Sequence, residues 1–192
     1  MIAIIDYGAG NIKSLQFALD RLGVNSVLTS DLNKILNADK VIFPGQGAAK
    51  SAMEKLKQQG LDKLILNLKQ PVLGICLGMQ LLCEFTEEGN IEGLGIIKGT
   101  VKRFTNEVKV PQMGWNSIHR LNGPLFDGIE AGAYMYLVHS YFVPELKETM
   151  AISNYNGAYS VALQKDNFYG VQFHPEKSST KGQLLLNNFL KL

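Results

Sequence analysis

The first half of the chain alternates short apolar runs with amphipathic stretches. Each run is short and rich in β-branched residues, as the buried strands of a parallel sheet are. The runs lie at residues 2–5, 26–29, 40–43 and 72–75. Strands separated by helices in this order predict a doubly wound, mostly parallel sheet that is flanked by helices and joined by right-handed crossovers.

Two of the amphipathic stretches predict helices with defined ends. Residues 11–22 place leucine and alanine side chains on one helical face, with Asn11 as the N-cap and Gly23 as the C-terminal stop. Residues 61–68 show a second helical pattern, which stops before Pro71. These helices supply the crossovers that a parallel sheet needs.

From about Leu94 the chain contains closely spaced strand candidates instead. They lie at residues 101–104, 134–138, 150–153, 160–164 and 168–173. Asn156-Gly157 and Asp166-Asn167 separate neighbouring candidates and predict hairpins, and residues 183–192 predict a closing amphipathic helix. We therefore expect a single α/β domain over residues 1–192, with an antiparallel β extension in its second half.

Composition and charge argue against several classes of protein. The 192 residues are 46% hydrophobic and 19% charged, with a net charge of +2, and the Lys and Arg residues form no basic stripe, so we expect no nucleic-acid partner. The N-terminus lacks the basic segment of a signal peptide, and no stretch approaches the roughly 20 apolar residues that span a bilayer. Because Cys76 and Cys83 make no disulfide framework, we expect a cytoplasmic protein with reduced thiols and no membrane partner.

The first candidate for chemistry is Cys76. It lies in the run Gly74-Ile75-Cys76-Leu77-Gly78, between the strand candidate at 72–75 and an apolar stretch at 79–85 that predicts a helix. A nucleophile flanked by glycines at a strand-to-helix turn is a nucleophile elbow, and the helix N-terminus favours a thiolate. The alternative is a buried structural cysteine, which is how we interpret Cys83, because no glycines flank it.

A nucleophilic thiol needs a general base and a group that orients the base. His174 and Glu176 are two residues apart around Pro175, which favours extended backbone, so both side chains can lie on one face. The carboxylate can then hold one ring nitrogen while the other nitrogen faces Cys76. A surface His–Glu pair is the alternative, and the presence of the elbow argues against it.

An oxyanion hole is the third requirement. The glycine-rich run Gly45-Gln46-Gly47 follows the strand candidate at 40–43, so its amides can turn toward a substrate. The amide of Leu77, directly after the nucleophile, is the natural second donor. For the glycine-rich run, a plain tight turn is the alternative.

Three other patterns predict no site. Gly8-Ala9-Gly10 follows a strand candidate, but Lys13 stands where a dinucleotide-binding fingerprint has its third glycine. Ser140 has no elbow around it. The chain's histidines lack the spacing of metal ligands, so we expect neither a metal nor a cofactor; these residues are His119, His139 and His174.

Together these motifs resemble those of class I, or triad, glutamine amidotransferases, in which an elbow cysteine and a His-Pro-Glu run near the C-terminus hydrolyse glutamine. The resemblance is closer to one subfamily, the glutaminase subunits of imidazole glycerol phosphate synthase, which act in histidine biosynthesis. It extends through the whole chain and rests on residues 6–11, 74–80, 111–116, 138–141 and 165–177.

The resemblance implies roles for residues that spacing alone does not assign. It implies that Cys76, His174 and Glu176 form the triad. It implies that Gln80 and Glu88 hold the α-amino and carboxylate end of the substrate glutamine, and that Gly47 adds backbone contacts.

The resemblance also implies a partner, a (β/α)₈-barrel cyclase subunit that forms a heterodimer with the glutaminase and receives its ammonia directly. The residues implied to face the barrel are Trp115, Asn116, Tyr136 and Lys177. Two positions depart from the pattern. Gln46 stands where many members have a small apolar residue, and Gln112, expected on the partner side, stands where many have a histidine.

Two other functions stay open. A triad glutaminase that serves another synthase would share the elbow, but the subfamily that feeds pyridoxal phosphate synthesis typically has Gly-Gly-Glu-Ser where this chain has Gly45-Gln46-Gly47-Ala48. A non-catalytic thiol scaffold on a similar fold would keep the cysteine, but it has no need for Glu176 two residues after His174.

Overall fold

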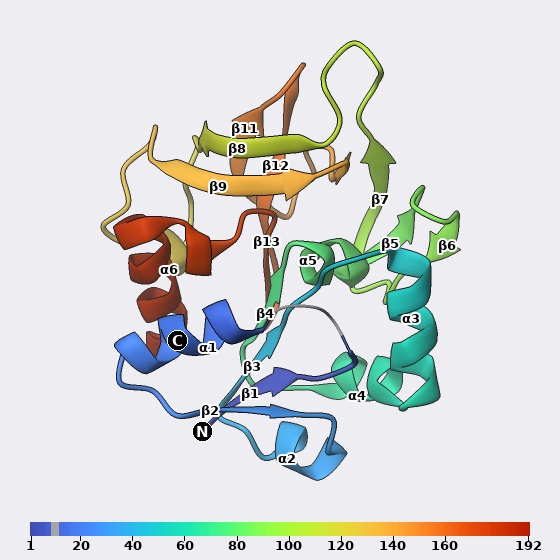
Figure 1. Cartoon of the computed structure of the whole chain (residues 1–192), viewed down its shortest axis with the longest axis vertical. Helices are drawn as coiled ribbons and strands as arrows, with labels where there is room; N and C mark the ends of the chain where they lie inside the picture. Colours follow the sequence, from blue (N-terminus) through green and yellow to red (C-terminus); the bar gives the residue numbers. More distant parts are fainter. Residues whose placement is uncertain (9–11) are drawn as a thin grey trace.

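A computed structural model describes residues 1–8 and 12–192, and within them the largest sheet has seven strands in the order β11-β12-β13-β4-β3-β1-β2 (Figure 1). From β2 to β13 all neighbouring strands are parallel, and β12 and β11 continue the sheet in antiparallel pairing. The strands are β1 (Ile2–Ile5), β2 (Ser26–Thr29), β3 (Lys40–Phe43), β4 (Val72–Ile75), β11 (Thr149–Asn154), β12 (Ala158–Lys165) and β13 (Phe168–Val171).

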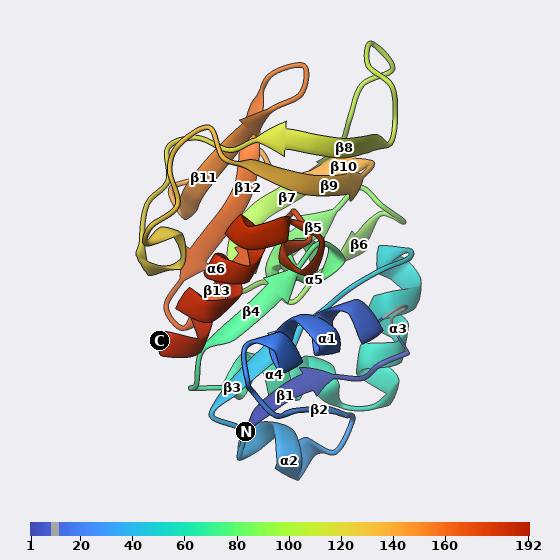
Figure 2. The same cartoon turned by 60° about the vertical axis from the view of Figure 1, so that its left-hand side comes forward.

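Helices cover both faces of this sheet (Figure 2). One face carries α1 (Lys13–Arg21) and α6 (Ser179–Lys191), and the other carries α3 (Ala49–Gln58), α4 (Leu61–Asn67) and α5 (Leu77–Leu82). The remaining helical segments are α2 (Leu32–Leu36) and two short 3₁₀ turns, η1 (Pro124–Phe126) and η2 (Pro175–Lys177). In residues 1–8 and 12–192, none of the helices combines the length and the apolar character that crossing a membrane requires.

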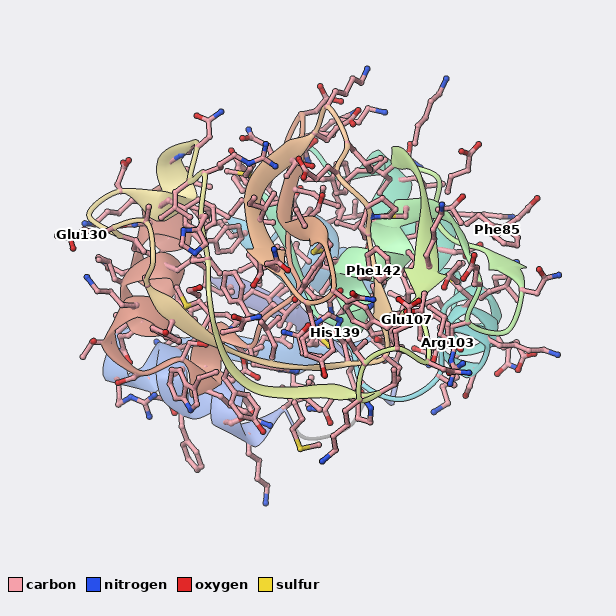
Figure 3. All side chains as sticks on the ribbon, turned by 90° about the horizontal axis from the view of Figure 1, so that it is seen from above. Phe85, Arg103, Glu107, Glu130, His139 and Phe142 are labelled. Atoms are coloured by element: carbon pink, nitrogen blue, oxygen red, sulfur yellow. The ribbon has the colours of Figure 1, made fainter. Side chains whose placement is uncertain are left out.

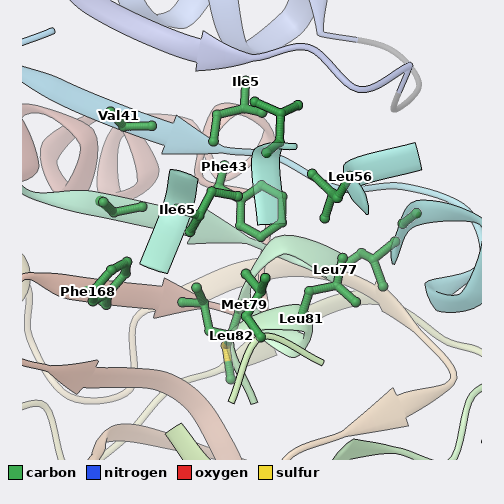
Figure 4. Packing of buried hydrophobic residues seen from close by; sticks show 14 of the residues in the cluster. Ile5, Val41, Phe43, Leu56, Ile65, Leu77, Met79, Leu81, Leu82 and Phe168 are labelled. Carbon is green, nitrogen blue, oxygen red and sulfur yellow. The ribbon is translucent and has the colours of Figure 1, made fainter. Parts of the chain in front are cut away.

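Alternation along the strands fills the two layers of the core. Successive side chains of a strand point to opposite faces, so neighbouring apolar residues enter different clusters. One cluster packs against α3, α4 and α5 (Figure 4), and its strand residues are Ala3, Ile5, Val41, Phe43 and Val72. The other cluster packs toward α1 and α6, and its strand residues include Ile2, Ile4, Ile42, Leu73 and Ile75. The runs that form β1, β3 and β4 are thus buried on both sides, as central strands of a parallel sheet must be, whereas β2 lies at the edge of the sheet and is partly exposed.

Two smaller sheets lie beside the central one. One has the order β10-β7-β5-β6 and the other pairs β8 with β9, which lie across one end of the molecule in Figures 1 and 2. Their strands are β5 (Cys83–Thr86), β6 (Ile91–Glu92), β7 (Ile97–Arg103), β8 (Gln112–Ser117), β9 (Tyr134–His139) and β10 (Tyr141–Phe142).

Most sequence expectations about the fold are confirmed. The four strands of the first half have the predicted bounds, and both predicted hairpins connect β11, β12 and β13. The first helix begins at Lys13, and its predicted cap Asn11 lies outside the described residues. One refinement is that β13, placed among the antiparallel candidates, pairs in parallel with β4 and so belongs to the doubly wound part.

The helix predicted over residues 79–85 is wrong in its second half, because α5 ends at Leu82 and Cys83 begins β5. The backbone at 93–97 supplies the reason. The amide of Leu94 donates to the carbonyl of Leu81 at 2.8 Å, and Cys83 pairs with Ile97 of β7. These long-range bonds occupy carbonyls that another helical turn would use, so tertiary pairing overrides the helical pattern.

Glycines allow β3, β4 and α5 to meet almost backbone to backbone. A Cβ atom on Gly78 would lie 1.9 Å from the carbonyl oxygen of Phe43, and one on Gly45 would lie 2.6 Å from the amide nitrogen of Gly78. A Cβ on Gly74 would lie 2.9 Å from the carbonyl of Gly78. Any side chain at these positions would force apart the elements that position residue 76.

Substitution Gly78→Ala should therefore destabilise the fold. The added methyl would meet main-chain atoms, which cannot rotate aside, so we expect a loss of roughly 3 kcal/mol or more in the free energy of unfolding. The measurement is urea denaturation followed by circular dichroism. As a control, Gly99→Ala meets only the side chain of Leu146, with Cδ1 nearest at 2.7 Å, and this methyl can move away. Equal denaturation midpoints for the two variants would contradict the packing argument.

Candidate functional site

Cys76 lies at the joint between β4 and α5 with an unusual backbone conformation. Its φ is 54° and its ψ is −111°, a region that a residue with a side chain rarely adopts. The amide of Cys76 donates to the carbonyl of Val171 at 2.8 Å, and its carbonyl accepts from the amide of Gln80 at 3.2 Å. Strain of this kind costs about 1–3 kcal/mol and persists only where surrounding packing enforces it. The elbow that the sequence predicts is therefore present in the backbone.

His174 and Glu176 form a buried pair. Nδ1 of the ring donates to Oε1 of the carboxylate at 2.9 Å, and the two side chains are 4% and 6% exposed. Two main-chain contacts hold the segment, because the His174 amide donates to the carbonyl of Tyr136 at 2.9 Å and the hydroxyl of Ser178 donates to the His174 carbonyl at 2.6 Å. The extended conformation expected of His174 is confirmed by its φ of −96° and ψ of 97°.

The pKa of His174 depends on burial and on two neighbouring groups, Cys76 and Glu176. Burial lowers the pKa of the imidazolium, but hydrogen bonds and charge interactions with Cys76 and with the Glu176 carboxylate more than offset this and raise the pKa to about 10. Since Nδ1 contacts Glu176, the ring nitrogen that interacts with Cys76 is Nε2. His174 thus interacts with the thiol of Cys76 on one side and with the carboxylate of Glu176 on the other.

A cavity of about 410 Å³ opens in front of Cys76, a volume within the range of small-molecule sites. Both Cys76 and His174 line it, together with five more of the residues that the sequence analysis assigns to the site: Gln46, Gly47, Leu77, Gln80 and Glu88. Two residues assigned to the site do not line it: Glu176 lies behind His174, and Gly45 is buried against Leu77 and Gly78. The close packing of Gly45 explains why this position is a glycine.

Gln80 and Glu88 offer oxygen atoms to the cavity. The side-chain nitrogen of Gln80 donates to the carbonyl of Tyr141 and to Oε1 of Gln172, both at 2.9 Å, so its carbonyl oxygen is the atom available to a ligand. Oε2 of Glu88 accepts from the amide of Ala49 at 3.1 Å, and burial raises the pKa of this carboxyl. Both residues present acceptors, which suits a ligand ammonium group.

Three of the four residues expected to face a partner lie together at the outer side of β8 and β9, and Asn116 is on the opposite face of β8. Trp115 and Tyr136 are cross-strand neighbours with ring centroids 6.1 Å apart, and Nζ of Lys177 lies 6.0 Å from the Tyr136 centroid. Asn116 lies on the same strand but donates to the carbonyl of Asn154 at 2.9 Å. Gln112 is placed differently from the expectation, because its side chain turns inward and is buried.

The inward turn of Gln112 connects it to a network that sequence reasoning missed. Its Oε1 accepts from the hydroxyl of Tyr159 at 2.8 Å, and that hydroxyl lies 3.3 Å from Nε2 of His139. His139 in turn donates through Nδ1 to the carbonyl of Tyr141 at 2.7 Å. Seen from above, His139 and Phe142 lie in the middle of the molecule, and Phe85 and Glu130 lie at opposite margins (Figure 3).

Gln172 is the second residue that sequence reasoning missed. It is fully buried, and its side-chain nitrogen lies 3.7 Å from Sγ of Cys76. The available signal was a polar residue between Val171 and Phe173, in a run that is otherwise apolar. Strand alternation alone does not show that this side chain reaches the elbow, because β13 ends at Val171.

Substitution Glu176→Gln should lower the pKa of His174. The amide keeps an acceptor for Nδ1 but removes the charge that stabilises imidazolium, so we expect a fall of at least about one unit. In the parent chain Cys76 and Glu176 together raise the pKa of His174, so their interactions with the protonated ring stabilise the fold fully below pH 6.5, and this contribution is lost as the pH rises through about 10. A ¹⁵N NMR titration of the ring measures the shift. The distant variant Glu130→Gln serves as control, and matching titrations in both variants would contradict the assignment.

Comparison with known proteins places the chain in a family. Over residues 3–192 it matches the family model for glutamine amidotransferase class-I. It is 53% identical to the imidazole glycerol phosphate synthase subunit HisH of Bacteroides fragilis, over 100% of this chain and 99% of that protein. It is 53% identical to the protein of the same name from Haemophilus influenzae, over 99% of this chain and 96% of that one.

Solved structures share the fold at low sequence identity. A structure described as a glutamine amidotransferase superposes with a TM-score of 0.77 at 16% identity, over 100% of this chain and 98% of that one. The structure of PurLQS from Thermotoga maritima superposes with a TM-score of 0.73 at 17% identity, over 99% of this chain and 97% of that one. The elbow at Cys76 and the full-length family match lead to one conclusion: the chain belongs to the class I glutamine amidotransferases.

Proposed function

We propose that this chain is the glutaminase subunit of an imidazole glycerol phosphate synthase, with Cys76, His174 and Glu176 as its catalytic triad. The observation that carries the proposal is that one cavity is lined by a strained thiol and by His174, whose ring is bonded to the buried carboxylate of Glu176. Relatives that bear the name of this synthase, about half identical over the whole chain, support the choice of synthase.

Each member of the triad has a step that suits its chemistry. Sγ of the Cys76 thiolate attacks the side-chain amide carbon of glutamine, forming a C–S bond while the carbonyl electrons move onto oxygen. The His174 imidazolium gives its proton to the amide nitrogen, the C–N bond breaks, and ammonia leaves a thioester behind. Neutral His174 then takes a proton from a water molecule while the water oxygen attacks the thioester carbon. The C–S bond breaks, which releases glutamate and restores the thiolate and the imidazolium. Glu176 keeps the ring oriented throughout.

The negative oxygen of each tetrahedral intermediate needs two donors. The amide of Leu77 at the start of α5 is one, and an amide of the Gly45-Gln46-Gly47 run is the other. Gly47 has a φ of +91°, a conformation that glycine adopts without a Cβ clash. The run can therefore turn one of its peptide planes toward or away from Cys76, which makes it the natural point of control.

The substrate's backbone end is assigned to Gln80 and Glu88. The oxygen atoms that these residues offer can accept hydrogen bonds from the α-ammonium of glutamine. Gly47 adds main-chain contacts at the same end. This arrangement leaves the side-chain amide of the substrate directed to Cys76.

The outer side of β8 and β9 is proposed as the surface that binds a (β/α)₈-barrel cyclase subunit in a heterodimer. Met113, Trp115 and Tyr134 are 66%, 52% and 60% exposed there, an apolar and aromatic character typical of interface anchors. The cavity at Cys76 reaches the same region, because Val138 of β9 and the adjacent Lys177 line it. Ammonia formed at Cys76 therefore has a short path to the partner, protected from protonation by water.

The other functions have less support. A glutaminase of another synthase fits the triad equally well, but the full-length relatives carry the name of this synthase. A thiol scaffold does not account for a buried carboxylate bonded to His174. A cytoplasmic location is also proposed, and the two free thiols support it.

The thiol assignment is tested with Cys76→Ala. Without the nucleophile no thioester forms, so glutamine-dependent turnover should be abolished, while added ammonium salts should still support synthesis when the partner is present. Glutamate release and product formation are the measurements. The control Cys83→Ala removes the other thiol and should leave glutamine turnover in place. Glutamine hydrolysis that survives in Cys76→Ala would falsify the assignment.

Activation by the partner is the next expectation. If one oxyanion donor is turned away in the isolated chain, its absence costs about 10²–10³ in rate, or roughly 2.7–4 kcal/mol, which an interface can supply by shifting populations. We expect at least about 10²-fold faster glutamate release in the complex with its nucleotide ligand than in the isolated chain. Steady-state rates for the chain, the complex and the liganded complex decide the point. Equal rates in all three would contradict gating but leave the triad intact.

A further inference from the structure

A chain of hydrogen bonds leads from the middle of the molecule to the sulfur of Cys76. The carbonyl of Tyr141 accepts from Nδ1 of His139 at 2.7 Å and from Nε2 of Gln80 at 2.9 Å. The same nitrogen of Gln80 donates to Oε1 of Gln172, also at 2.9 Å. Nε2 of Gln172 then lies 3.7 Å from Sγ of Cys76, within the reach of a hydrogen bond to sulfur.

The carbonyl of Tyr141 determines the direction of each later hydrogen bond in this series. A main-chain carbonyl can only accept, so the side-chain atom of Gln80 that faces Tyr141 must be nitrogen. That nitrogen also faces Gln172, so the atom of Gln172 nearest to it must be the carbonyl oxygen. The remaining end of the Gln172 amide, which faces Sγ, is therefore the N–H donor, and the usual ambiguity of amide orientation is removed.

Burial strengthens the hydrogen bond from Gln172 to Sγ. Gln172 is fully buried and Gln80 is 5% exposed, so water does not compete strongly for the bond. Sγ also lies 3.9 Å from the main-chain carbonyl of Val138, which can accept from a thiol but repels a thiolate. The N–H donor of Gln172 has the opposite effect and therefore favours the deprotonated sulfur.

We propose that Gln172 is a further catalytic residue, which donates its side-chain N–H to the Cys76 thiolate and is held in that orientation by Gln80 and the carbonyl of Tyr141. The inference rests on the proposed role of Cys76 as nucleophile. It assigns to Gln172 the task of stabilising and aiming the attacking sulfur, and to Gln80 a positioning task in addition to substrate binding.

The test is the pH dependence of Cys76 alkylation by iodoacetamide, measured in the complex with the partner by peptide mass, so that Cys83 does not contribute. Gln172→Met keeps the length of the side chain but has no donor, and the pH midpoint of alkylation should rise by about one unit. Glutamine turnover should show kcat about tenfold lower, with KM changed less than about twofold. The titratable groups that face Sγ or line its cavity are present in every variant: Tyr7, Glu88, His139, Tyr141, His174 and Lys177.

A second variant guards against a folding defect. Gln172→Asn keeps a polar amide but is one methylene too short to reach Sγ, so it should raise the midpoint in the same direction. The control Gln164→Met changes a glutamine at the far end of the β12–β13 pairing and should leave the midpoint unchanged. Parent-like midpoints in folded Gln172→Met and Gln172→Asn would overturn the proposal. Alkylation reads the sulfur directly, so a parent chain without glutamine turnover would count against the proposed function and not against this bond.

Discussion

The near contact between the backbone of α5 and the ends of β3 and β4 is the constraint on which the site depends. Gly78 lies so close to the carbonyl of Phe43 that no side chain fits between them. With both strands and the helix fixed at that distance, residue 76 has to turn sharply, and its φ of 54° is the result. The strain is offset by buried apolar packing on both sides of the sheet, and the thiol is left projecting into the cavity.

A second set of contacts ties the base to the exposed sheet. The His174 amide donates to the carbonyl of Tyr136, and the Tyr136 amide donates to the hydroxyl of Ser178, so β9 and the segment that carries His174 are bonded in both directions. Tyr136 also faces Trp115 on the outer side of the same strands. Two hydrogen bonds therefore connect this surface directly to the segment that carries the imidazole.

The parts of the site that the sequence predicts are those encoded by local patterns. The paired glycines around Cys76 predict a backbone turn, and the spacing of His174 and Glu176 around Pro175 predicts two side chains on one face. Both patterns involve residues that are close together in the sequence. Gln172 and His139 are different, because their roles come from contacts with residues far along the chain, 96 positions away for Gln172 and Cys76 and 20 for His139 and Tyr159. The predicted C-terminal end of α5 was wrong for the same reason, because the hydrogen bond from Leu94 to Leu81 depends on tertiary structure.

The two buried histidines near the cavity show how one environment produces opposite protonation states. Burial lowers the pKa of both, and for His139, whose ring contacts a carbonyl and a phenol, the pKa falls to about 4, with the charge of His174 acting in the same direction. His174 differs because its ring interacts with Cys76 and with the Glu176 carboxylate, which reverse the effect of burial. Neutral His139 is thus suited to a fixed hydrogen-bond network and charged His174 to proton transfer. The neighbours Cys76 and Glu176, rather than depth in the molecule, therefore distinguish the candidate general acid–base from a structural histidine.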